Sequence, residues 1–174
     1  MKKKMYSVPE AMKPEVDALL KGITKEEDRI AKFEEEYVNR FYPIDIPEAF
    51  FRRPVHMRSG EDYVVEVEMK VVLGSGDDQE SYDIVASGNG PLNAVANGLL
   101  QTQYASLFKF DAYHEGAMND DFNSYAEAYI AIVDPVGNKF WGTGLHTDIL
   151  LAAVNALISA LNRREAAELA AAQK

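Results

Sequence analysis

Two stretches of the chain decide its fold: SGNGPLNAVANGLL (residues 87–100) and LHTDILLAAVNALI (residues 145–158). In each, a polar turn leads into an amphipathic helix pattern. The aligned pairs are Ala94 with Ala152, Asn97 with Asn155, Leu99 with Leu157 and Leu100 with Ile158. Two amphipathic helices can align by chance, but the same order of strands before each of them favours an internal duplication.

The segments before these helices have the period of two that is typical of β-strands. Predicted elements of the first half are strands at 49–58, 63–73 and 80–87 and a helix at 91–103. Those of the second half are strands at 104–113, 125–133 and 139–145 and a helix from about 147 to beyond 164. One strand–strand–strand–helix unit leaves a sheet face open, so we expect two units to pack together. The sequence therefore predicts an α+β fold of two pseudo-symmetric βββα units.

The first forty residues have helical periodicity instead. We expect a helix at 9–23, then a capping box at Thr24–Glu27 that opens a second helix. The stripe of this second helix is Ile30, Phe33, Tyr37 and Phe41, and its Glu- and Lys-rich face is expected to be solvated. Pro43 and Pro47 indicate a boundary. The predicted domains are a helical arm at 1–46 and a domain at 47–174, made of repeats at about 49–103 and 104–165.

Composition excludes several classes of function. Lys and Arg number 18 and Asp and Glu 28, for a net charge of −10, which disfavours binding to nucleic acid or to an anionic membrane. The chain has no Cys, so disulfides and thiolate metal sites are excluded. No apolar run is long enough to span a membrane, and no signal peptide is recognisable. These features fit a cytoplasmic protein.

Catalytic motifs are weak. The chain lacks a P-loop, and Gly142-Thr143-Gly144 lacks the third glycine of a dinucleotide fingerprint. A polar cluster of His114-Glu115 with His146 and Asp148 would suit acid–base work. The alternative is a structural histidine or a helix cap. Ser87 does not match a nucleophile elbow, because Val85 occupies the first glycine position.

Two strand-to-helix junctions remain as candidate sites, at residues 87–91 and 142–148. Glycines let the backbone approach a ligand or adopt positive φ, and a helix N-terminus offers free N–H groups to an anion. Asp148 would compete with an anion or meet an ammonium group. Such a pair of junctions is suited to a zwitterion such as an amino acid. The alternative is that the glycines serve only tight turns.

Four blocks resemble the C-terminal regulatory domain of 2-isopropylmalate synthase, in particular the form of actinobacteria and fungi. They are residues 87–94, 113–118, 141–149 and 156–163, in that order and spacing. The helical arm also resembles that enzyme's linker, with Phe33-Glu34-Glu35-Glu36-Tyr37 before the domain. The resemblance covers roughly residues 50–164.

This resemblance implies a dimerising domain that binds leucine as a feedback inhibitor between two βββα units. The full enzyme condenses acetyl-CoA with 2-oxoisovalerate in a catalytic barrel that holds a divalent metal. The chain has neither the barrel nor its metal motif, so we expect no cofactor and no catalysis here. The implied partners are leucine or another branched-chain amino acid, a second copy and the barrel. The implied effector-binding residues are Gly88, Asn89, Gly90, Leu92, Ala94, Tyr113, Ala117, His146, Asp148 and Ile149.

The chain departs from the family pattern in two places. The family commonly has Tyr-Glu-His-Ala where this chain has Tyr113-His114-Glu115-Gly116-Ala117, and the loop at 119–126 also differs. Both changes affect the loop that would cover the ligand. One alternative is therefore the homologous domain of citramalate synthase, which binds isoleucine, although the block around Trp141 favours the leucine enzyme. Others are a module that only dimerises and a small enzyme that uses His114, Glu115 and His146.

Overall fold

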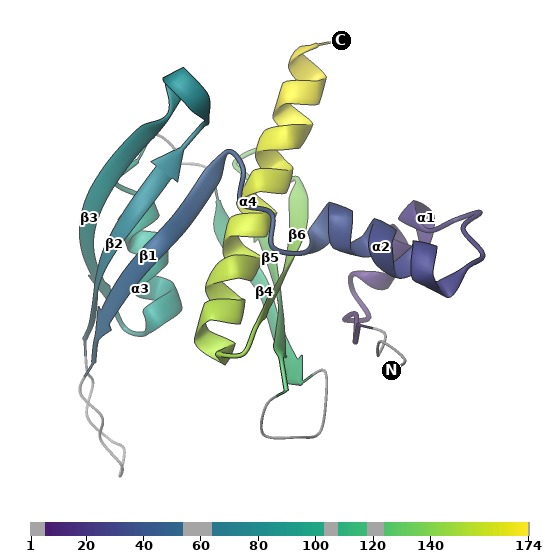
Figure 1. The fold of residues 1–174 in the computed structure, drawn as a ribbon, viewed down its shortest axis with the longest axis horizontal. Helices are drawn as coiled ribbons and strands as arrows, with labels where there is room; N and C mark the ends of the chain where they lie inside the picture. Colours follow the sequence, from purple (N-terminus) through teal and green to yellow (C-terminus); the bar gives the residue numbers. More distant parts are fainter. Residues whose placement is uncertain (1–5, 54–63, 103–107, 118–123, 174) are drawn as a thin grey trace. The chain divides into compact units, whose positions relative to one another are not determined.

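A computed structural model of the 174-residue chain describes residues 6–53, 64–102, 108–117 and 124–173. It contains two three-stranded antiparallel sheets, with strand orders β1-β2-β3 and β4-β5-β6 (Figure 1). Each sheet is followed by a helix, and two helices precede the first sheet. This arrangement confirms the predicted α+β class and its two βββα units.

The elements in chain order are α1 (Lys13–Leu19), α2 (Glu26–Tyr37), β1 (Ile44–Arg52), β2 (Val65–Leu73), the 3-10 turn η1 (Gly76–Asp78), β3 (Glu80–Gly88), α3 (Pro91–Leu99), β4 (Lys109–Ala117), β5 (Ala126–Val133), β6 (Lys139–His146) and α4 (Ile149–Ala172). Among the described residues, no helix has the length and apolarity that crossing a membrane requires.

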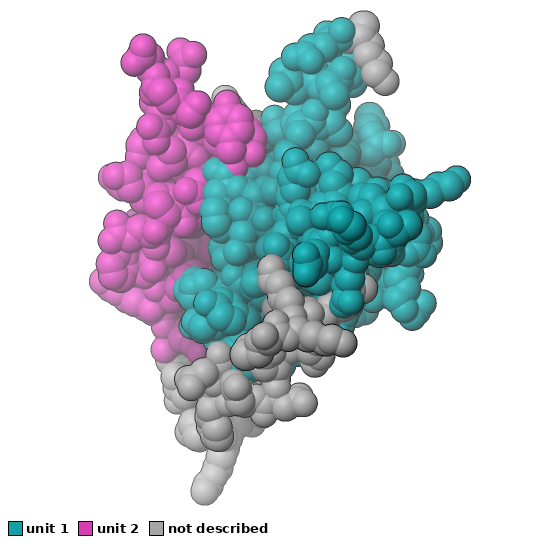
Figure 2. Space-filling view, turned by 45° about the vertical axis from the view of Figure 1, so that its right-hand side comes forward, with its two compact units in different colours: residues 1–41, 109–174 teal, residues 42–108 magenta. Residues whose placement is uncertain are grey.

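Backbone contacts group the chain into two compact units, which Figure 2 colours separately. Unit 1 contains residues 1–41 and 109–174, and therefore the helical arm and the second βββα repeat. Unit 2 contains residues 42–108, and therefore the first repeat. The arm thus shares a unit with the second repeat. A domain division at residue 46 stays a prediction.

In unit 2, the alternation predicted for β2 is confirmed. Val65, Val67 and Met69 are buried, and the glutamates between them are exposed. Helix α3 packs on this buried face, where a Cβ on Gly98 would lie 2.3 Å from the end of Met69. Pro47 does not end the strand, because it lies at a β-bulge on the edge strand β1, where no ladder hydrogen bond is required of it.

In unit 1, the β4-β5-β6 sheet is covered on both faces. Helix α4 packs on β5 and β6 from one side. On the other side, the arm contributes Met12, Phe33 and Tyr37 to a core cluster with Tyr129 and Trp141. This double cover explains why nearly all of β5 is buried instead of every second residue.

The arm also covers the edge of β6. Val38 forms a parallel bridge to Thr143, and the side chain of Asn39 pairs with both backbone groups of Leu145, accepting from N–H at 3.0 Å and donating to C=O at 3.1 Å. Asn39 adopts a positive φ of 49°, which asparagine tolerates better than most residues. An exposed strand edge is thereby closed.

Several predicted boundaries are wrong. The capping box is one: the N-cap of α2 is Lys25, which makes no side-chain cap, so Thr24 lies one residue too early. Phe41 lies beyond the helix and is exposed. Strand β1 begins at Ile44, α3 ends at Leu99, and β4 runs later than predicted, to Ala117. The predicted segments at 54–58, 63, 103 and 104–107 lie outside the described residues.

Candidate functional site

At the first junction, β3 passes into α3 through Gly88, Asn89 and Gly90. The side chain of Asn93 folds back, and its Oδ1 accepts the N–H of Asn89 at 3.0 Å. A Cβ on Gly88 would lie 2.4 Å from that same oxygen and 2.6 Å from the N of Ala94. Gly88 is therefore required here by the close approach of the helix, independently of any ligand.

The N-terminus of α3 carries no side-chain cap. Its N-cap is Gly90, whose extended backbone would leave an added Cβ in open space, and the first helical residue is Pro91, which has no N–H. The first-turn N–H groups of a helix have no acceptor within the helix and carry partial positive charge. Leu92 in this turn is half-buried and Ala94 is fully buried. The junction is suited to an anionic group.

The second junction has the opposite character. Asp148 is the N-cap of α4, and its carboxylate accepts the N–H of Leu150 at 2.8 Å. The N–H of Asp148 in turn donates to Nδ1 of His146 at 2.9 Å. Ile149 follows and is 41% exposed. Because a carboxylate already occupies this helix N-terminus, the junction repels anions and favours a cation.

Gly142 and Gly144 lie within β6, not in a turn, and have a packing role. A Cβ on Gly144 would lie 1.8 Å from the carbonyl oxygen of Ala152, and one on Gly142 would lie 2.2 Å from that of Ala156. Helix α4 therefore rests directly on the strand backbone. The predictions that these two glycines serve a ligand or a tight turn are wrong.

Tyr113 and Ala117 lie on β4. Strand register places both on the sheet face against which α4 packs on β6. Tyr113 pairs with Ile130, which pairs with Gly142, and Ala117 shares a row with His146. The hydroxyl of Tyr113 donates to the carboxylate of Glu115. Burial, and to a smaller extent this carboxylate, raises the pKa of Tyr113 above its usual value.

His114 and Glu115 do not form the predicted acid–base cluster. Neighbours on a strand point to opposite faces, and His114 lies 6.3 Å, ring centroid to centroid, from Trp141 on the face that the arm covers. His146 and Asp148 bond to each other locally, which matches the interpretation as a helix cap. No group of three acidic or histidine side chains suited to a metal occurs within the described ranges.

The predicted effector residues thus fall into two sets. The first junction gathers Gly88, Asn89, Gly90, Leu92 and Ala94 in unit 2, and the second set in unit 1 is Tyr113, Ala117, His146, Asp148 and Ile149. The divergent loop lies mostly at 118–123, outside the described residues. Glu115 was predicted only as part of the acid–base cluster, not as an effector residue. Its spacing of two from Tyr113 on a strand was the signal that both side chains share a face.

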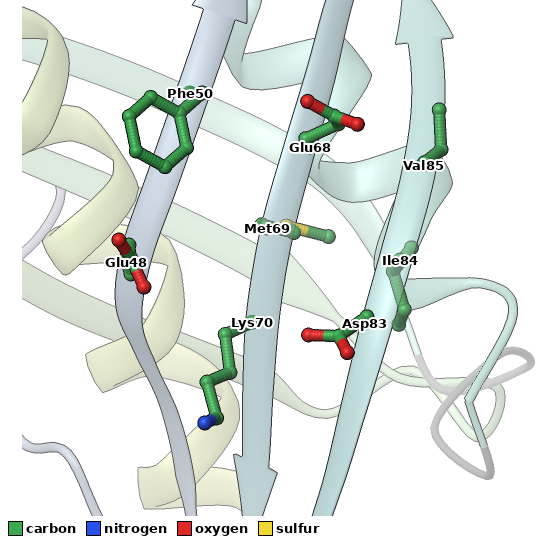
Figure 3. Close-up of a pocket in the computed structure, with 8 residues that line it drawn as sticks. All are labelled: Glu48, Phe50, Glu68, Met69, Lys70, Asp83, Ile84 and Val85. Atoms are coloured by element: carbon green, nitrogen blue, oxygen red, sulfur yellow. The ribbon is translucent and has the colours of Figure 1, made fainter.

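A separate hollow of about 220 Å³ lies on the sheet of unit 2 (Figure 3). Its polar lining consists of Glu48, Glu68, Lys70 and Asp83. It contains none of the predicted effector residues. In register, Lys70 on β2 is opposite Glu48 on β1 and Asp83 on β3, so a basic residue stands between two acidic ones in this row of the sheet.

The two βββα units, each with a strand–helix junction, define an α+β domain with an internal structural repeat. The sequence model described as the LeuA allosteric (dimerisation) domain matches residues 27–165, and the chain belongs to this family. The 2-isopropylmalate synthase of Clostridium acetobutylicum is 30% identical over 91% of the chain and 28% of its own length. That of Desulfitobacterium hafniense is 34% identical over 84% of the chain and 24% of its own length. The chain therefore spans about a quarter of these curated relatives.

Proposed function

We propose that this chain is the leucine-binding regulatory and dimerisation part of a 2-isopropylmalate synthase. In this proposal leucine acts as the feedback inhibitor, and catalysis belongs to the barrel of the enzyme. Support comes from the family match over residues 27–165 and from relatives that carry this enzyme's name. The partners we propose are a second copy of the chain and the catalytic barrel.

The opposite character of the two helix N-termini carries the proposal. Helix α3 begins at Gly90 without a side-chain cap, and helix α4 begins at Asp148 with a carboxylate cap. Taken separately, the first terminus is suited to a carboxylate and the acidic surroundings of the second to an ammonium group, which are the two charged groups of a free amino acid. Neither terminus alone distinguishes an amino acid from a simple ion.

Each terminus, within its own unit, has an aliphatic side chain nearby that is compatible with a branched-chain ligand. Leu92 in the first turn of α3 is half-buried, and Ile149 at the start of α4 is 41% exposed. A hydrophobic pocket separates ligands that differ by one methyl group by only about 1–3 kcal/mol. Leucine is proposed as the effector because the relatives are named 2-isopropylmalate synthases, the family whose resemblance implies leucine as the inhibitor.

Calorimetric titration with leucine, isoleucine and valine in parallel tests this function. Saturable binding that prefers leucine supports it. Preference for isoleucine would assign the chain to a citramalate-type enzyme. Flat titrations with all three from a folded dimer would leave dimerisation as the function.

A substitution at the α3 N-cap sharpens the test. Gly90→Asp places a carboxylate where the ligand's carboxylate would bind, and the extended backbone of Gly90 with open space beyond its Cα accepts the new side chain. We expect helix stability to be kept or raised, and leucine affinity to fall at least about 10-fold. Ser75→Asp is the matched control, because Ser75 is likewise an N-cap residue without a side-chain cap, at the short η1 turn, and gains the same charge.

A further inference from the structure

Glu115 lies on the same face of the second sheet as three of the proposed effector residues. Glu115 on β4 is paired with Ala128 on β5, which is paired with Gly144 on β6, and Gly144 faces α4. Directly opposite residues in antiparallel strands share a face. The next row along the strands holds Ala117 and His146. The carboxylate therefore lies on the α4 side, beside the second junction.

The carboxylate is held in place and still accessible. Helix α4 packs on β5 and β6, while Tyr113, Glu115 and Ala117 on β4 stay exposed. The hydroxyl of Tyr113 binds one oxygen of Glu115, Oε2. An ionised carboxylate has about four lone-pair sites on two oxygens, so one bond from a tyrosine leaves acceptors for a further donor.

From this geometry we propose that Glu115 binds the ammonium group of the effector and thereby determines that the site accepts an amino acid. The inference rests on the function proposed above. Asp148 is the other carboxylate at this junction, but it caps α4, and the partial positive charge of the helix N-terminus already offsets its own charge. Glu115 is anchored by a neutral hydroxyl, which does not offset its negative charge. An ammonium group both compensates that charge and supplies donors.

The test combines one substitution with two ligands. Glu115→Gln keeps the shape and removes the charge, and 2-hydroxy-4-methylpentanoate keeps the shape of leucine and replaces its ammonium group by a hydroxyl. The matched control is Glu80→Gln, because Glu80 also accepts a hydrogen bond from a tyrosine two residues away, Tyr82, at 2.6 Å, but lies at the far end of β3. Calorimetry measures each dissociation constant, and circular dichroism checks that each variant is folded.

We expect Glu115→Gln to weaken leucine binding by about 10- to 100-fold, the range for a charge-assisted hydrogen bond. Binding of the hydroxy acid is expected to change less than about 3-fold, and Glu80→Gln is expected to change neither. Leucine binding by Glu115→Gln within 2-fold of the unaltered protein would overturn the proposal, as would equal weakening of both ligands. If the unaltered protein binds no branched-chain amino acid, the function proposed above fails, and this inference with it.

Discussion

Replacing Gly144 by alanine tests the packing that joins α4 to the second sheet. The added Cβ would lie 1.8 Å from the carbonyl oxygen of Ala152 and 2.6 Å from the backbone N of Ala156. Both are backbone atoms of α4, so no side-chain rotation relieves the overlap. An ordinary contact begins at 3.4 Å, so the helix would have to move by about 1.6 Å.

A shift of this size removes packing along the whole contact. A gap of 0.5–1 Å already forfeits roughly a quarter to a half of the dispersion energy of the atoms that line it. Overpacking in cores typically costs about 1–3 kcal/mol, and the rigid backbone places Gly144→Ala at the upper end. We expect the free energy of unfolding to fall by about 3 kcal/mol or more.

Urea unfolding followed by tryptophan fluorescence measures this effect. Trp141 is the only tryptophan of the chain and is buried in β6, so its emission reports on this sheet. Gly90→Ala is the control, because an added Cβ there meets nothing within 4 Å. We expect its unfolding free energy to fall by no more than about 1 kcal/mol, because alanine is a poorer N-cap residue than glycine. A change below about 1 kcal/mol for Gly144→Ala would refute the close contact with α4.

Three further predictions concern unit 1. Asp148→Ala removes the cap on the N–H of Leu150 and is expected to lower the unfolding free energy by about 1 kcal/mol in urea titrations; an unchanged midpoint would contradict the cap. Arg163 forms an ion pair with Glu36 at 3.1 Å and stacks on the ring of Tyr37, both in the arm. Arg163→Met is therefore expected to lower the free energy of unfolding by about 2 kcal/mol and to speed limited proteolysis of residues 6–41. Unaltered cleavage would show that this arginine does not hold the arm. Burial alone would raise the pKa of Asp134, but hydrogen bonds, mainly from the turn that follows it, outweigh burial and lower the pKa below 3.8. The ionised carboxylate therefore stabilises the folded protein above about pH 4, and this contribution is lost as the pH falls further. Asp134→Asn should therefore flatten the acid limb of a thermal-stability profile, and an equally steep limb would count against this role.

The second and third strands of each sheet could be predicted from the sequence because turn residues bound their apolar runs. For β2, β3, β5 and β6, the predicted and observed ends agree within about two residues. The first strand of each sheet was harder to predict. On β4, Tyr113, His114 and Glu115 are all exposed, so hydrophobic period offered no guide to its start or end. On β1, Pro47 is typical of a break and is instead tolerated at an edge bulge.

The sequence pattern also did not predict that the second sheet is covered on both faces. The β5 sequence, AEAYIAIV, is compatible with a strand buried on both faces, but nothing local says which element supplies the second cover. The arm supplies it through contacts more than a hundred residues apart in the chain, such as Asn39 with Leu145. Local periodicity predicts which face of a helix is apolar, not which distant surface it meets.

The glycines show why a site is harder to read than a fold. In sequence, Gly142-Thr143-Gly144 and Gly88-Asn89-Gly90 have the same pattern of two glycines around one polar residue before a helix. In the structure, Gly142 and Gly144 make room for the backbone of α4, and Gly88 makes room for the side chain of Asn93 and the start of α3. An added Cβ on Gly90 would meet only open space. A missing Cβ has the same one-letter code whether a helix, a turn or a ligand requires it. Gly90 is therefore the glycine whose substitution separates ligand binding from packing, because alanine there leaves the fold unstrained and aspartate there occupies the helix N-terminus.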